Sequence, residues 1–329
     1  MALLTALLVI AGILIGAWLD QEIFSPPRRA LQQYHLERLQ HPAQFGLRIR
    51  SYACLAGTAP CLLVEPDAQA GAGERGRKLR EQLLAKGFSV PTYGTVKGIV
   101  VLLHGRNGRK EDLLPVAERF VAAGFRCLIP DLPGHGDSPL RVMAFGSSTF
   151  ERTLPRQILA DAREHFHLPD EPAALWGLSM GGAFAVSAAS ESPQTWNGLM
   201  VVSSFATLDS VMERQIPAKW RTLVTSTLLP FINMAQFLQG QPSVAAMTPQ
   251  RWAEHIALPA LIVHGDKDAF IPLQQGRNLY TALASPQKRW LTVPDGGHAN
   301  ILSTTMPLYA EMSAWLLQTL PRQTLVSTR

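Results

Sequence analysis

From Gly98 onward, short apolar runs alternate with longer segments in which apolar residues recur every three or four positions. The runs suit strands buried on both faces, and the longer segments suit helices with one apolar face. This alternation predicts an α/β fold with a mostly parallel central sheet and helices on both faces. The predicted strands lie at 99–103, 127–129, 174–176, 199–202, 260–263 and 290–293, with helices near 113–121 and 155–166.

The first 19 residues contain no charged side chain and are almost entirely apolar. At about 1.5 Å per residue, such a helix just spans a hydrocarbon layer of roughly 30 Å. A cleaved signal peptide would begin with positive charge and end at a small-residue site, and neither feature precedes Asp20. We therefore interpret residues 1–19 as an uncleaved membrane anchor that Asp20 and Glu22 bring to an end.

Two features of the anchor region bear on topology and assembly. Gly12 and Gly16 have the spacing at which two membrane helices approach closely, so a homodimer through them is a weak hypothesis. Arg28 and Arg29 follow the span and favour a catalytic domain on the cytoplasmic side.

Two of the cysteines favour the opposite side of the membrane. Cys54 and Cys61 flank a turn and are placed to pair across a hairpin, which would require an oxidising compartment. Two unpaired cysteines fit the same sequence, so the disulfide and the membrane side both stay open.

Composition divides the chain into four parts. A stretch of Gly, Ala, Arg and Glu at 67–80 predicts an exposed insertion after a hairpin formed by 45–50 and 60–64. Residues 206–257 separate two core strands by far more than a normal loop and are rich in large apolar side chains, which predicts a small helical lid over an acyl-binding pocket. The expected parts are an anchor at 1–24, a linker helix with N-terminal strands and the insertion at 25–97, a catalytic domain at 98–320 and a tail at 321–329.

Overall composition excludes several classes of protein. With 47% apolar and 17% charged residues, the chain can bury a large core. Its net charge of +5 is scattered, without the basic stripe of a nucleic-acid-binding surface. Its three cysteines and its other metal-binding residue types show no ligand spacing, so neither a metal nor an organic cofactor is expected.

The segment Gly177-Leu178-Ser179-Met180-Gly181 joins an apolar run to a helix of small residues. This is the pattern of a nucleophile elbow, a sharp strand-to-helix turn that exposes one serine above a sheet. Gly177 and Gly181 are needed because side chains there would collide where strand and helix cross. We therefore predict that Ser179 is a nucleophile. The simpler alternative is a glycine-rich turn with a capping serine.

The ends of the later strands supply a base and an acid. In open parallel sheets, chemistry gathers at the carboxyl ends of the strands. Asp266 and Asp268 follow the run at 260–263, and both compete for the acid that orients the base. His298 follows the last strand on a glycine-flanked loop, which lets its ring reach the elbow.

The end of the first parallel strand supplies the other half of an oxyanion hole. The backbone N–H of Arg106, together with that of Met180, is expected to bind a developing oxyanion. We interpret His104 as structural, and Asp131 and Asp137 as turn caps.

A group of cations lies near the mouth of this site. Arg106, Arg109 and Lys110 either favour an anionic head group or are solvated surface charge, and the second interpretation is favoured.

Residues 95–320 resemble the α/β-hydrolase superfamily. In the pattern of that family the acid falls on Asp268 rather than Asp266, and Gly297-His298 matches the position of its histidine. Ser203-Ser204-Phe205 and the later elements are similar to membrane-anchored serine hydrolases of the serine aminopeptidase and depalmitoylase-like branch. The motifs that carry the resemblance are His104-Gly105, Asp131-x-x-Gly134-x-Gly136-x-Ser138, Gly177-x-Ser179-x-Gly181 and His264-Gly265-x-x-Asp268.

The combined expectation is a membrane-anchored serine hydrolase that uses Ser179, His298 and Asp268 on a carboxylic ester or thioester. The lid favours a small-molecule or lipid-like ester with an apolar acyl group. A peptidase or amidase and an acyltransferase would use the same three residues. A catalytically inactive, membrane-tethered binding protein is the alternative from another class.

Overall fold

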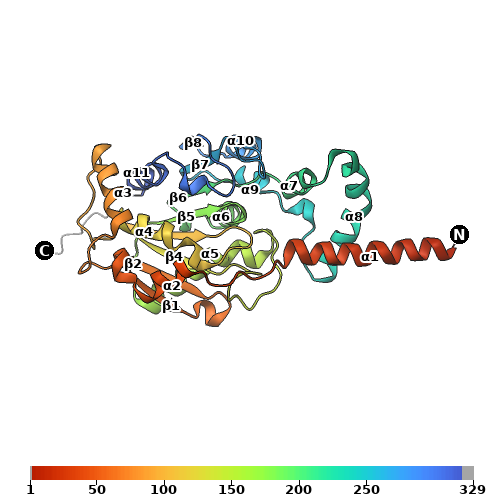
Figure 1. The fold of residues 1–329 in the computed structure, drawn as a ribbon, viewed down its shortest axis with the longest axis horizontal. Coiled ribbons are helices and arrows are strands. Elements are labelled where there is room, and N and C mark those ends of the chain that lie inside the picture. The colour runs from red at the N-terminus through yellow and green to blue at the C-terminus, as the bar shows by residue number, and fades with distance from the viewer. Residues whose placement is uncertain (1, 321–329) are drawn as a thin grey trace.

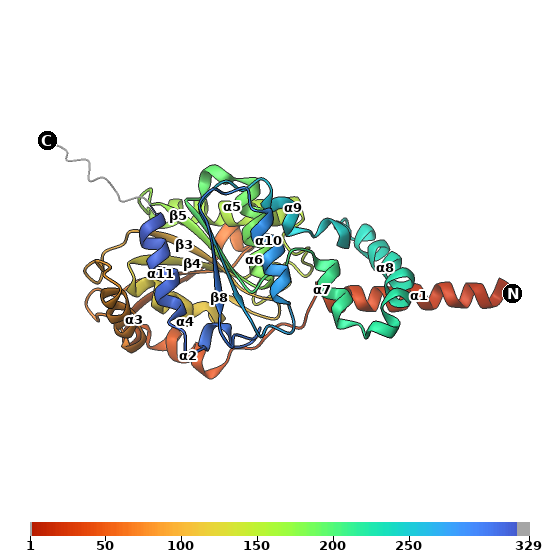
Figure 2. The same cartoon turned by 90° about the horizontal axis from the view of Figure 1, so that it is seen from above.

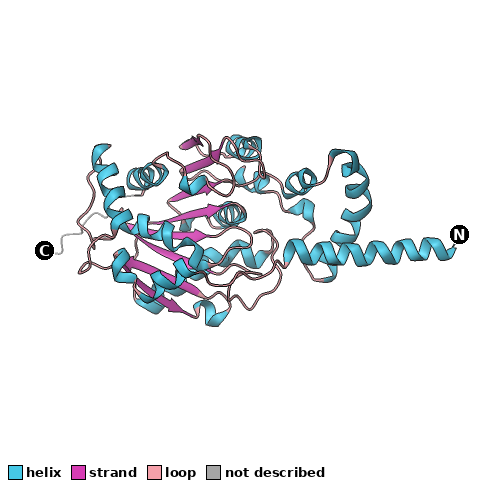
Figure 3. Ribbon diagram, in the orientation of Figure 1, coloured by secondary structure: helices cyan, strands magenta, loops and turns pink. Residues whose placement is uncertain are grey.

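An eight-stranded sheet forms the centre of the fold, with helices on both of its faces (Figure 1, Figure 3). The computed structural model describes residues 2–320, so Met1 and the predicted tail at 321–329 lie outside the described residues. The strand order is β1-β2-β4-β3-β5-β6-β7-β8. The strands are β1 (Leu47–Tyr52), β2 (Cys61–Pro66), β3 (Gly98–Leu103), β4 (Phe125–Pro130), β5 (Ala173–Leu178), β6 (Gly198–Val202), β7 (Ala260–Gly265) and β8 (Lys288–Val293).

Neighbouring strands pair in parallel throughout the series β4-β3-β5-β6-β7-β8. The strands β1 and β2 form an antiparallel hairpin at one edge of the sheet. The mostly parallel sheet predicted from the sequence is therefore confirmed. The carboxyl ends of parallel strands lie at the same edge of the sheet, so the loops after β3, β5, β7 and β8 gather on one side.

Two layers of helices bury the apolar strands, which explains their uninterrupted hydrophobic runs (Figure 2). One layer consists of α3 (Glu74–Ala85), α4 (Leu114–Ala122) and α11 (Leu308–Thr319). The other consists of α5 (Thr149–Phe166), α6 (Met180–Glu191), α9 (Pro249–Ala253) and α10 (Leu273–Ala282). The expected linker helix is α2 (Gln33–Gln40).

The predicted exposed insertion at 67–80 includes the first turns of a helix, and most residues from Glu74 to Lys78 are exposed. Helix α3 begins at Glu74, and its Leu79 and Leu83 are buried while it packs on α4 and α11. Two leucines four positions apart suffice for the inner face of a short surface helix. Because the stretch is rich in Gly, Ala, Arg and Glu, its few apolar residues did not indicate a helix in the sequence.

Helix α1 (Ala2–Phe24) projects from the domain (Figure 1). The stretch Leu3–Phe24 contains an 18-residue window with a mean hydropathy of 2.2 and is long and apolar enough to cross a membrane. Contrary to expectation, Asp20 and Glu22 do not end the helix. The Asp20 carboxylate is buried and accepts hydrogen bonds from the side-chain amides of Gln236 (2.5 Å) and Gln239 (2.6 Å), which lie far away in the sequence and stabilise its charge.

The small-residue face of α1 packs against the chain itself. Helix α8 (Ala218–Leu238) packs against α1, and in Figure 1 it stands across the direction of α1. A Cβ atom at Gly12 or Gly16 would overlap Phe231 of α8. The close approach expected for a homodimer is therefore made within one chain, and that face is not free for a second copy.

The region at 206–257 is helical, and it divides in two. Helices α7 (Leu208–Gln215) and α8 stand away from the sheet, whereas α9 packs on α6 and α10 as part of the domain (Figure 2). The three cysteines are free and buried, so Cys54 and Cys61 adopt the unpaired arrangement.

Candidate active site

Ser179 is the single residue between β5 and α6, and its backbone conformation is strained. Its φ of 53° and ψ of −118° are unfavourable for a residue with a side chain. Two contacts hold this geometry, because the Ser179 N–H donates to the Val202 carbonyl at 2.9 Å and the Ser204 hydroxyl donates to the Ser179 carbonyl at 2.7 Å. The turn therefore presents the Ser179 side chain at the carboxyl edge of the sheet.

The glycines on either side of Ser179 have a steric role. A Cβ atom at Gly177 would overlap the Gly181 carbonyl, and one at Gly181 would overlap the Leu103 carbonyl at the end of β3. Strand and helix can cross this closely only because both positions lack side chains.

Three loops bring the predicted nucleophile, base and acid together. The Ser179 Oγ lies 3.0 Å from Nε2 of His298, and Nδ1 of His298 lies 2.8 Å from Oδ2 of Asp268. The other aspartate in competition, Asp266, is exposed to solvent. The three side chains form a continuous hydrogen-bonded chain although they lie far apart in sequence.

The environment of Asp268 sets the tautomer of His298. Burial by itself would raise the pKa of Asp268, but hydrogen bonds from His298 and from the Ile271 N–H outweigh it and hold that pKa below its usual range. The Asp268 carboxyl is therefore ionised at neutral pH and accepts the proton on Nδ1 of His298. Nε2 of His298 is then free to accept a proton from Ser179.

The N–H groups expected to form an oxyanion hole belong to Met180, which follows Ser179, and to Arg106, in the loop after β3. Met180 is the first residue of α6, so its N–H has no partner within the helix. Gly105 lies against Ser179, because a Cβ atom at Gly105 would stand 3.5 Å from the Ser179 Cβ, and Arg106 is the next residue.

The Arg106 side chain turns away from this site to the end of α1. Its guanidinium donates to the Ile23 carbonyl at 3.3 Å and to the Glu22 carbonyl. The loop beside Ser179 is thus tied to the apolar N-terminal helix, a link for which the sequence contains no signal.

Comparisons with known proteins agree with this architecture. Residues 94–250 match the family model described as serine aminopeptidase, S33. A pimeloyl-(acyl-carrier protein) methyl ester esterase of Xanthomonas campestris pv. campestris is 26% identical over 241 residues, which cover 62% of this chain and 88% of that protein. The chain has the α/β-hydrolase fold.

Solved structures extend the likeness of this α/β hydrolase to most of the chain. An esterase from Pyrococcus furiosus matches with a TM-score of 0.61 at 14% identity, covering 90% of this chain and 98% of that one. A membrane phospholipase A matches with a TM-score of 0.52 at 17% identity, covering 97% of both chains. At these identities the likeness concerns the fold.

His104 has the structural role assigned to it from the sequence. Its Nε2 accepts from the Leu132 N–H at 3.1 Å, so its Nδ1 carries the proton and donates to the Gly105 carbonyl at 2.9 Å. Burial lowers the pKa of His104 to about 4. This neutral imidazole joins the end of β3 to the loop after β4.

Arg109 and Lys110 are neither solvated nor directed at a ligand, so both interpretations of their charge were wrong. The Lys110 ammonium is buried 2.7 Å from Asp131 and 2.5 Å from Asp137, and Arg109 lies 3.1 Å from Asp137. Asp131 also accepts from the backbone N–H groups of Lys110 and Asp137, which agrees with its interpretation as a cap. A buried carboxylate such as Asp131 needs a nearby cation, and the residues after β3 provide it.

The described residues contain no candidate metal centre. Within residues 2–320, no group of three or more His, Cys, Asp or Glu side chains is arranged to hold a metal ion.

A buried carboxylate near the site ties stability to pH. Glu151, in the first turn of α5, accepts from the N–H groups of Ala144 (2.7 Å) and Gly146 (2.9 Å) and so holds Phe145 between two other aromatic rings. Burial raises the pKa of Glu151 to about 7 from an ordinary value of 4.5, despite these hydrogen bonds.

We expect this α/β hydrolase to lose stability as pH rises from about 5 to about 7. Over that range the folded chain still holds the Glu151 proton, which the unfolded chain has released, so the free energy of unfolding falls with pH by up to about 3 kcal/mol. Thermal unfolding of the detergent-solubilised protein at pH 5 and pH 8 measures the effect. In Glu151→Gln the midpoint should be lower but less dependent on pH, and an unchanged pH dependence would contradict the assignment.

Proposed function

We propose that this α/β hydrolase is a membrane-anchored serine hydrolase that cleaves a carboxylic ester or thioester. The observation that carries the proposal is the unbroken chain of hydrogen bonds from Ser179 through His298 to Asp268 on a strained elbow. Names of relatives, such as the methyl ester esterase, support hydrolysis of an ester. The arrangement of these three side chains at one strand edge suits nucleophilic attack on a carbonyl carbon.

Each residue has a defined role in the proposed reaction. Nε2 of His298 accepts the proton as the Ser179 Oγ attacks the carbonyl carbon, and Asp268 stabilises the imidazolium that results. The N–H groups of Arg106 and Met180 bind the oxyanion of the tetrahedral intermediate. His298 then protonates the leaving alcohol or thiol, and an activated water releases the acid from the acyl-enzyme.

An apolar cavity supports an apolar acyl group. The cavity has a volume of 260 Å³ and lies between α1, α7 and α8. Its apolar lining includes Leu19, Ile23, Met212, Ile216, Leu228 and Ile232. The end of α1 that lines it is the end held by Arg106, which brings the cavity towards the proposed oxyanion loop.

Membrane attachment is proposed for α1 because many of its apolar side chains are exposed. Leu3, Leu14 and Trp18 are 76%, 66% and 60% exposed, although they lie on one continuous apolar helix. A bilayer would cover these side chains, whereas water would not. On this proposal the anchor also forms one wall of the acyl cavity.

Filling the apolar cavity should change the preference for acyl chain length. Val224 lines it, so Val224→Trp should lower kcat/KM for p-nitrophenyl decanoate about tenfold while leaving p-nitrophenyl acetate within about twofold. Leu223→Trp is the matched control, because Leu223 is 54% exposed on the same helix and does not line the cavity. An equal loss on both esters in Val224→Trp would argue against an acyl-binding role.

The proposed function is tested by labelling the full chain with a fluorophosphonate probe and then assaying a panel of substrates. An active serine should react covalently, and an inactive binding protein should not. The panel should hold esters, thioesters and an amino-acid anilide, since the matching family model is described as an aminopeptidase. Turnover of the anilide alone would move the assignment to a peptidase.

A further inference from the structure

A large, partly exposed aromatic side chain lies beside the histidine proposed as the base. The ring centroid of Phe270 is 5.0 Å from that of His298, and the two ring planes meet at 47°. Phe270 is 46% exposed, and among the described residues it belongs to neither of the two hydrophobic cores that cover the faces of the sheet. Because much of its surface stays in water, its ring contributes less to folding than a core phenylalanine does.

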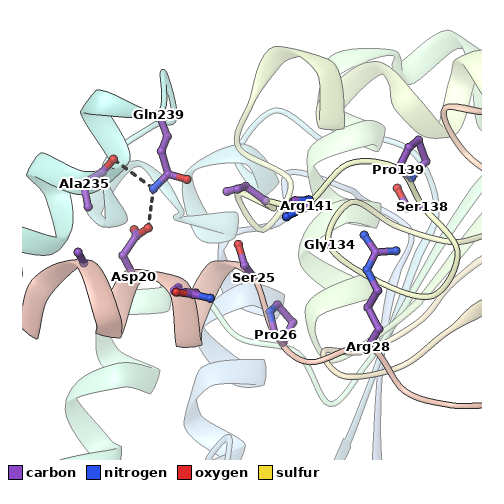
Figure 4. Close-up of a pocket in the computed structure, with 13 residues that line it drawn as sticks. Asp20, Ser25, Pro26, Arg28, Gly134, Ser138, Pro139, Arg141, Ala235 and Gln239 are labelled. Atoms are coloured by element: carbon purple, nitrogen blue, oxygen red, sulfur yellow. Dashed lines mark hydrogen bonds between the residues drawn. The ribbon is translucent and has the colours of Figure 1, made fainter.

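Phe270 also lies outside the two cavities at the α1 end of the molecule. The polar cavity in Figure 4 is lined by residues of α1, of the segment 134–142 and of the end of α8. The apolar cavity between α1, α7 and α8 has a different lining, and Phe270 is part of neither. Its ring is therefore not a wall of the space proposed for the acyl group.

The backbone of the same residue contacts the acid. The Phe270 N–H donates to Oδ1 of Asp268 at 3.1 Å, while Oδ2 of that carboxylate lies 2.8 Å from Nδ1 of His298. Phe270 thus contacts the acid through its backbone and the base through its ring. The turn that places the Asp268 carboxylate also places the aromatic ring against the imidazole.

The loop that carries His298 fixes its backbone more firmly than its ring. The Lys267 N–H donates to the Gly296 carbonyl at 3.0 Å, which ties this loop to the loop after β7. The Gly297 N–H donates to Oδ1 of Asn300 at 2.6 Å, which closes the turn around His298. The His298 side chain is nevertheless 25% exposed, which leaves space for other rotamers.

In the proposed reaction, the imidazole loses one of its two restraints when the acyl-enzyme forms. In the free site, Ser179 and Asp268 contact the two ring nitrogens of His298. Once the Ser179 Oγ carries the acyl group it has no proton to donate, so Asp268 alone holds the ring while water is activated. An aromatic ring packed against the imidazole then limits the rotamers that it can adopt.

We propose that Phe270 is a positioning residue that holds the His298 imidazole in line with Ser179 in both halves of the reaction. This role rests on the proposed function, because it requires His298 to be the base. Phe270 acts through His298 and not through the substrate. Loss of its ring should therefore slow all substrates by the same factor, whatever their acyl chain, and leave KM nearly unchanged.

The test compares Phe270→Ala with Phe270→Tyr in the detergent-solubilised full-length chain. Phe270→Ala should lower kcat about tenfold for both p-nitrophenyl acetate and p-nitrophenyl decanoate, and should slow labelling by a fluorophosphonate probe by a similar factor. Phe270→Tyr restores a ring of the same shape and should stay within about twofold of the parent in all three measurements. Unfolding midpoints of both variants should stay close to that of the parent, because the ring lies outside the hydrophobic cores.

Leu84→Ala is the control, because Leu84 is an apolar residue of α3 that is 60% exposed, and its turnover should equal that of the parent. Phe270→Leu keeps an apolar side chain in case alanine disturbs the fold, and it should lose kcat by a smaller factor. A loss confined to KM or to the decanoate ester would overturn the positioning role. Full activity of Phe270→Ala would overturn that role alone, whereas a parent chain that does not react with the probe would overturn the proposed function.

Discussion

Replacing Ser179 with alanine should reduce turnover of p-nitrophenyl butyrate by roughly 10⁴-fold or more. The substitution removes the oxygen that lies within hydrogen-bond distance of Nε2 of His298, so no acyl-enzyme can form. Alanine, like serine, carries a Cβ atom and no further branch, and the elbow keeps its contacts through the backbone N–H and carbonyl of residue 179. The loss should therefore appear in kcat without a loss of fold.

Initial rates at saturating ester, together with fluorophosphonate labelling, measure this effect. Ser51→Ala is the matched control, because Ser51 is an exposed serine on the edge strand β1. Its turnover should equal that of the parent. If Ser179→Ala still hydrolysed the ester at the parent rate, the proposed nucleophile would be wrong.

The second large effect is expected from Asp268→Asn. Oδ1 of Asp268 accepts from the N–H groups of Phe270 (3.1 Å) and Ile271 (2.8 Å), so the oxygen of an asparagine would keep that position. Its NH₂ group would then face Nδ1 of His298 and donate to it. The imidazole would be forced to carry its proton on Nε2, where it cannot accept a proton from Ser179.

We expect kcat of Asp268→Asn to fall by about 10³- to 10⁴-fold at pH 7, with KM changed far less. Full ester kinetics of the variant provide the measurement. Asp266→Asn is the control, since Asp266 lies two positions away and is exposed. Comparable losses in the two variants would show that local charge, rather than the tautomer of His298, governs the rate.

Much of the sheet could be predicted because its signals are local. Buried parallel strands must be continuously apolar, so the runs at 99–103 and 199–202 mark strands whatever surrounds them. The placement of Ser179 also follows from a local requirement, since only glycine fits at the two positions where β5 and α6 cross. The candidate site residues could be predicted because they follow parallel strands, and the carboxyl ends of parallel strands share one edge of the sheet.

Charges and sparse helices were harder to interpret. Lys110 has the sequence context of a solvated loop residue, and only the proximity of Asp131 and Asp137 turns it into a buried counterion. Helix α3 has too few apolar residues to stand out, and it forms because α4 and α11 cover Leu79 and Leu83. In both cases the deciding partner lies far away in sequence.

By itself, the sequence determined the α/β architecture, the elbow at Ser179 and the apolar character of α1, because each depends on residues that are neighbours along the chain. Only the tertiary structure decided that Gly12 and Gly16 face Phe231 and that Arg106 holds the end of α1. The physical reason is that hydrogen bonds and close packing act over a few ångströms in space, so they are set by how distant segments meet.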